Sequence, residues 1–74
     1  MTAKEWIEAF AEAIGTTAPD DETNTVLLEL AGEAAHSSER VAAPIACYLA
    51  GQKGVDPGKA LELARKLAAG DGSP

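Results

Sequence analysis

The sequence predicts a single all-α domain, a compact bundle of about four short helices. A chain of 74 residues is long enough for one domain and too short for two. Apolar residues recur at helical spacing, turn and capping residues separate the apolar segments, and no segment alternates as a strand would. The expected helices span about residues 3–14, 21–38, 42–53 and 57–69. They belong to one domain over residues 1–74, with a frayed tail at 71–74.

The first and fourth segments carry the clearest helix starts. Thr2 and Glu5 have the spacing of a capping box, in which each side chain bonds the other residue's backbone N–H. Asp56 is a suitable N-cap for the fourth helix, with Pro57 at the first helical position. Gly15 is well placed to end the first helix. Both segments have an apolar stripe and a charged outer face, so we expect each to cover the core.

The two middle segments are expected to lie centrally. The second begins near Asp20 or Asp21 and has a broad apolar face. The third is apolar all round, and such a helix is either buried in its own chain or covered by a partner. If the other helices leave Ile45, Tyr48 and Leu49 exposed, we expect these three side chains to mark a partner interface.

The charge pattern excludes some classes of partner. The net charge is −6, with nine acids and one base in residues 1–39 against three acids and five bases in residues 40–74. No basic stripe is present, so we expect no binding to nucleic acid. The longest apolar run, residues 41–50, is about half of the roughly 20 residues that cross a bilayer, so we expect no membrane segment.

The residues with reactive side chains do not form a recognisable catalytic site. No phosphate-binding loop, dinucleotide fingerprint or metal-binding cysteine pair occurs. Ser37 and Ser38 follow His36 directly, and neighbours on a helix point apart rather than pairing as nucleophile and base. The lone Cys47 cannot form an internal disulfide, lies among apolar residues, and fits an unreactive thiol in a cytoplasmic protein. We therefore lean against an enzyme and expect no cofactor or metal.

One polar cluster offers a candidate binding site. His36, Glu39 and Arg40 share a face if the second helix is continuous through them. An imidazole beside the planar guanidinium of Arg40 could bind a phosphate or carboxylate. The structural alternative is a helix end at which His36 and Arg40 complement the dipole and pair with Glu33. Glu33 and Glu39 would also repel an anion, and the sequence leaves both interpretations open.

The stretch from Leu30 to Gly51, LAGEAAHSSERVAAPIACYLAG, resembles a small actinobacterial domain of unknown function, the DUF6457 type. The likeness rests on Ala35-His36, Arg40, Ala43-Pro44 and Leu49-Ala50-Gly51. Trp6 and the alanine-rich last helix extend it over nearly the whole chain. The family often has proline after the arginine, where this chain has Val41, so the backbone after Arg40 is expected to differ.

The resemblance implies a biological setting rather than a reaction. Such domains occur alone or appended to molybdenum-cofactor guanylyltransferases, which make molybdopterin guanine dinucleotide. This chain has no Gly-rich nucleotide loop and cannot be that enzyme. The leading hypothesis is a non-enzymatic accessory module that binds a protein partner in molybdenum-cofactor biosynthesis, such as the transferase itself.

Two alternatives accompany this hypothesis. The domain could bind a nucleotide or pterin phosphate through His36 and Arg40, the polar positions that match the family. It could also be a homodimer whose core includes the third helix.

Overall fold

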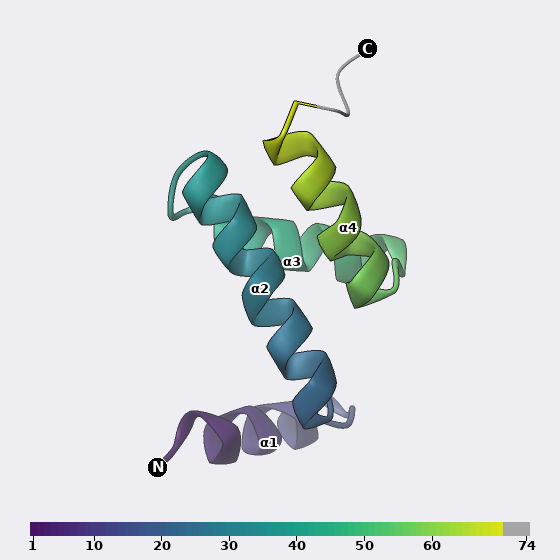
Figure 1. Ribbon diagram of the computed structural model, residues 1–74. Helices are drawn as coiled ribbons and strands as arrows, with labels where there is room; N and C mark the ends of the chain where they lie inside the picture. The colour runs from purple at the N-terminus through teal and green to yellow at the C-terminus, as the bar shows by residue number, and fades with distance from the viewer. Residues whose placement is uncertain (71–74) are drawn as a thin grey trace.

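The computed structural model describes residues 1–70 and contains four α-helices and no strand within them. The helices are α1 (Ala3–Ile14), α2 (Asp21–Ser37), α3 (Ala42–Lys53) and α4 (Pro57–Ala68), as Figure 1 shows. The predicted all-α class is confirmed. The second and fourth helices end at Ser37 and Ala68, one residue earlier than expected. The tail expected to fray, residues 71–74, lies outside the described residues.

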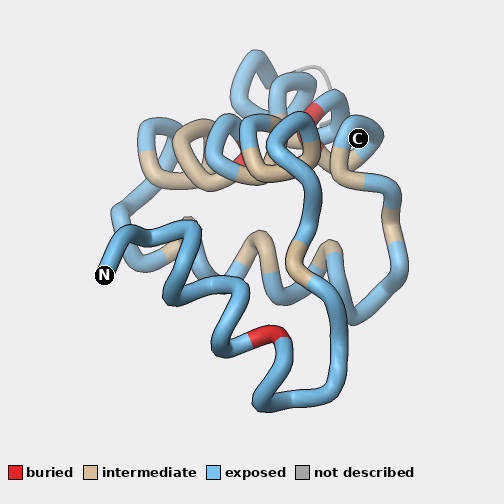
Figure 2. The backbone as a smooth tube through the Cα atoms, turned by 90° about the horizontal axis from the view of Figure 1, so that it is seen from below, coloured by how far each residue is buried: buried red, intermediate tan, exposed pale blue. Residues whose placement is uncertain are grey.

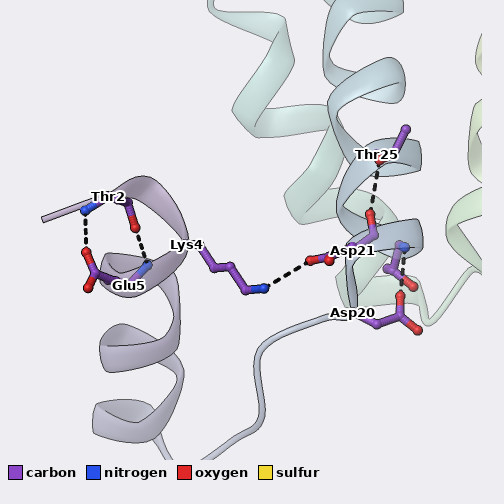
Figure 3. A network of polar contacts seen from close by, with 7 residues as sticks. Thr2, Lys4, Glu5, Asp20, Asp21 and Thr25 are labelled. Carbon is purple, nitrogen blue, oxygen red and sulfur yellow. Dashed lines mark hydrogen bonds and ion pairs between the residues drawn. The ribbon is translucent and has the colours of Figure 1, made fainter.

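Local side-chain hydrogen bonds determine where α1 begins and ends. The Thr2 hydroxyl accepts a hydrogen bond from the Glu5 backbone N–H at 3.1 Å, and the Glu5 carboxylate accepts one from the Thr2 N–H at 2.8 Å (Figure 3). Gly15 ends the helix in the left-handed region at φ 85°, a conformation that costs glycine little. The predicted capping box and the predicted terminal glycine are both confirmed.

Aspartate side chains cap the N-termini of α2 and α4. The Asp20 carboxylate accepts a hydrogen bond from the Thr23 N–H at 2.8 Å, at the start of α2 (Figure 3). The Asp56 carboxylate accepts one from the Lys59 N–H at 3.3 Å, with Pro57 at the first position of α4. Each cap satisfies a backbone donor that the helix itself leaves unpaired.

The centre of the fold is α2, as the sequence predicted. It packs against both α3 and α4, and Figure 1 shows α4 alongside it and α3 crossing it. The two most deeply buried large side chains belong to these packed helices: Leu30 of α2 is 3% exposed and Leu61 of α4 is 7% exposed. Arg65 of α4 also pairs with Glu29 of α2 at 2.8 Å. The helix α3 lies at the edge, since none of its residues is buried, so the expectation that it is central is wrong.

The position of α1 differs from the prediction. It lies across the N-terminal end of α2, apart from α3 and α4 (Figure 1), and the molecule extends 41 Å along its longest axis. Trp6 and Phe10 are about half exposed, and most of α1 is pale blue in Figure 2. The expectation that α1 covers the core is therefore wrong. Amphipathicity shows that a helix has an apolar face, but it does not say what covers that face.

We expect Leu30→Ala to lower the free energy of unfolding by about 3 kcal/mol, because it removes a buried side chain and leaves a cavity beneath α4. The matched control is Leu28→Ala, on the same helix, where the side chain is 74% exposed and the loss should stay below about 1 kcal/mol. Urea denaturation followed by circular dichroism measures both. Equal losses would contradict the core described above.

The caps also predict an acid-sensitive stability. Hydrogen bonds from the Thr23 backbone and side chain lower the pKa of Asp20, and those from Thr2 lower the pKa of Glu5. A carboxylate with a lowered folded-state pKa contributes stability above its ordinary pKa, and this contribution disappears as the pH falls through the folded value.

Asp20→Asn should flatten the fall in unfolding free energy between about pH 5 and pH 2, because the amide oxygen caps without titrating. Asp20→Ala should instead be less stable than the wild type at neutral pH. Denaturation curves at a series of pH values test both expectations, and an Asp20→Asn profile as steep as the wild type would refute the assignment.

Candidate functional site

The turn between α2 and α3 separates the residues of the predicted polar cluster. The helix α2 ends at Ser37, and Ser38 leaves helical geometry at φ −146° and ψ −102°. The Ser37 hydroxyl donates a hydrogen bond to the Glu33 carbonyl at 2.6 Å, and the Ser38 hydroxyl donates one to the Ala34 carbonyl at 2.7 Å. Each is a hydrogen bond from a side chain to the carbonyl one helical turn earlier. The helix is therefore not continuous from His36 to Arg40.

His36 lies in the last turn of α2, whereas Glu39 and Arg40 lie in the turn that follows. Backbone bonds from the Ala42 N–H to the Glu39 carbonyl and from the Ala43 N–H to the Arg40 carbonyl close this turn. All three predicted side chains are exposed, and no hydrogen bond or ion pair within residues 1–70 joins them. Helical spacing does not bring these side chains together, and anion binding by them stays a prediction.

The predicted partner residues on α3 are exposed. Ile45 is 57% exposed and Tyr48 is 64% exposed, and Val41 at the preceding turn is 69% exposed. These three residues follow one another at spacings of four and three along the helix, so they lie on one side of it. We call Val41, Ile45 and Tyr48 the α3 outer face. The Gln52 amide donates a hydrogen bond to the Tyr48 hydroxyl at 3.4 Å.

Leu49, the third predicted residue, borders a groove between α3 and α4 rather than the α3 outer face alone. The groove holds about 390 Å³ and is almost wholly apolar. Its lining comprises Leu30, Ala46, Leu49, Ala50, Val55, Ala60, Leu63, Ala64 and Leu67. A second hollow of about 340 Å³ continues it towards Ala34 and Ala68. We call this surface the α3/α4 groove, and sequence reasoning missed it because it depends on how two helices cross.

A further hollow of about 470 Å³ lies between α1 and α2. Ile7 borders it on the α1 side, Leu27 and Leu28 border it on α2, and Cys47 of α3 reaches its edge. The Cys47 sulfur lies 3.8 Å from the Leu27 carbonyl oxygen, and partial burial raises the pKa of the thiol. Less thiolate at neutral pH means a slower nucleophile.

The described residues contain neither a cluster of metal-binding side chains nor a buried polar group. No three histidine, cysteine or acidic side chains of residues 1–70 gather into a metal site. Over the same residues, no polar or charged side chain is buried. None of the helices in this range is both long and apolar enough to span a bilayer. The arrangement instead provides exposed apolar surface on α1, on α3 and between α3 and α4.

These features define the chain as a small helical domain whose prominent surfaces are apolar and open. The chain matches the family described as a domain of unknown function, DUF6457, over residues 1–70, and it belongs to that family. The resemblance found in the sequence is thereby confirmed. No curated protein and no solved structure matches the chain.

Cys47 provides a direct test of packing between α2 and α3. Because its pKa is raised by burial, we expect the folded protein to react with a thiol reagent severalfold more slowly than the same chain unfolded in urea. Cys47 is the only cysteine, so the reaction reports on a single site. Glutathione at matched pH and urea corrects for the solvent. An equal rate in the two states would show that the thiol is not shielded.

Proposed function

We propose that this domain is a non-enzymatic interaction module that binds a protein partner through the α3 outer face. The observation that carries the proposal is the exposure of Val41, Ile45 and Tyr48, which places three large apolar side chains on one side of one helix. Soluble monomers seldom expose a large contiguous apolar patch unless a partner covers it.

The chemistry of this face supports a protein partner. No charged residue occurs from Val41 to Gln52, and the centres of protein interfaces are depleted of charge. Tyr48 adds an amphipathic side chain of the type that often dominates binding energy at interfaces. Its hydroxyl is bonded only weakly within the chain, at 3.4 Å from Gln52, which leaves it available to a partner.

The partner that we propose is a molybdenum-cofactor guanylyltransferase. The support is the family to which the chain belongs, together with the expectation that such domains accompany this enzyme. The domain would act as an accessory to the transferase, docking on it or helping to pass on the cofactor, while the reaction stays in the enzyme's own nucleotide-binding domain. With a net charge of −6, the domain favours a docking surface on the transferase with basic residues around an apolar centre.

The experiment is co-purification and titration of the domain with the guanylyltransferase from the same source. We expect binding by the wild type and a loss of at least about tenfold in affinity for Ile45→Ser with Tyr48→Ser, because both side chains would be anchors of the interface. Both side chains are exposed, so the variant should keep its helices, which circular dichroism checks.

The matched control is Leu28→Ser, which makes an exposed leucine of α2 polar and should leave binding unchanged. A wild-type domain that fails to bind the transferase would refute the proposed partner. Unchanged binding by the double variant would refute the proposed face.

A further inference from the structure

Two apolar surfaces of the described chain, a helical stripe and a groove, do not meet within one copy. The first is the α1 stripe, which consists of Trp6, Phe10 and Ile14 and is about half exposed or more. The second is the α3/α4 groove. Within residues 1–70, α1 packs closely against neither α3 nor α4, and Figure 1 shows it at the opposite end of α2 from the α4 C-terminus.

The α1 stripe has the form of a helix that binds in a groove. Its three anchors lie four residues apart, so they follow one side of the helix. The rings of Trp6 and Phe10 stack with centroids 5.1 Å apart and planes inclined by 11°, which makes their outer surface continuous. From Trp6 to Ile14 the helix advances about 12 Å, and α4 advances by the same distance along the groove from Ala60 to Ala68.

Charge favours this groove over a pairing of α1 with the α1 of a second copy. One lysine and three glutamates give α1 a net charge of −2, whereas two lysines, one arginine and one glutamate give α4 a net charge of +2. Pairing α1 with the α1 of another copy would bring two acidic helices together. Placing it beside α4 brings opposite charges together, which orients and accelerates association.

The exposed area is also larger than a folded monomer of this size needs. A compact protein of 7.6 kDa exposes about 4,300 Å². This chain exposes 5615 Å², an excess on the order of 1,000 Å². A stable interface buries about 800 Å² on each partner, and the excess is of that order.

We propose that the domain forms a two-fold homodimer in which α1 of each copy occupies the α3/α4 groove of the other. Both contacts are then equivalent, as two-fold symmetry requires, and the association closes at two copies. Leu63 and Leu67, which are exposed in the single chain, become covered by the partner's stripe. The α3 outer face takes no part in these contacts, so this inference is independent of the proposed transferase binding.

The first experiment is sedimentation equilibrium of the wild type over a range reaching high micromolar concentration. We expect twice the mass of 7.6 kDa at the upper end, with a red shift of Trp6 emission as the dimer dissociates on dilution. Trp6→Ala with Phe10→Ala should weaken the dimer at least about tenfold, because it removes two anchors. Leu28→Ala, which removes an exposed apolar side chain outside both surfaces, should not weaken it.

The second experiment uses charge reversal and identifies the surfaces that meet. Glu8→Lys with Glu12→Lys makes α1 basic, and Lys59→Glu with Lys66→Glu makes α4 acidic. Each double variant alone should dimerise about tenfold more weakly at low salt, because α1 and α4 then carry net charges of the same sign in both contacts. A one-to-one mixture should form a heterodimer at wild-type strength, because both of its contacts pair opposite charges.

A wild-type protein that stays monomeric at high micromolar concentration would overturn the proposal. So would an α4 charge reversal that leaves the dimer intact, because α1 would then bind elsewhere, for example to another α1. Neither result would affect transferase binding through Ile45 and Tyr48, so the two proposals can fail separately.

Discussion

The structure depends on one constraint, which is that four short helices enclose too little volume for the apolar side chains of this chain. Within residues 1–70, only Leu30 and Leu61 among the large apolar side chains are buried, and neither is buried completely. A small domain keeps a large share of its unfolded surface exposed, and helices of about three turns can each reach few neighbours. The helix α2 takes the one position that packs on two sides. The other three helices keep apolar surface outside, and this surface is where function is to be sought.

The parts of the fold that could be predicted from the sequence are those decided within a few residues. The caps at Thr2, Asp20 and Asp56 each join a side chain to a backbone N–H three residues away, so their signals are local and readable. The position of α1 depends instead on the path of the chain through residues 15–20. Among the described residues, one exposed ion pair, Lys4 to Asp21 at 3.4 Å, links the two helices here (Figure 3), and such pairs contribute little to stability. The pattern of apolar residues does not predict the path of residues 15–20, so the position of α1 could not be predicted from it.

The candidate sites divide in the same way. Ile45 and Tyr48 are exposed because α3 is apolar on every side and the other helices cover only part of it. The all-round apolar character of α3 could be recognised from the sequence. The interpretation of His36 and Arg40 as one helical face required α2 to continue, but α2 ends at Ser37 and Ser38 leaves helical geometry. The sequence signal for the end of α2 was the pair of serines after His36, because serine side chains compete with helical backbone hydrogen bonds. The α3/α4 groove had none, since a groove is a property of two helices and their crossing.

The uneven distribution of charge decides which exposed apolar surface α1 of a second copy favours. Apolar burial is not directional, so by itself it would let α1 associate with any exposed stripe. An acidic α1 and a basic α4 narrow the choice of contact, because like charges disfavour the pairing of α1 with α1 and opposite charges favour the pairing of α1 with α4. If α1 and α4 associate between two copies, the dimer presents two α3 outer faces. A partner with two docking surfaces would then bind more tightly than either face alone allows, by effective concentration rather than by any new contact.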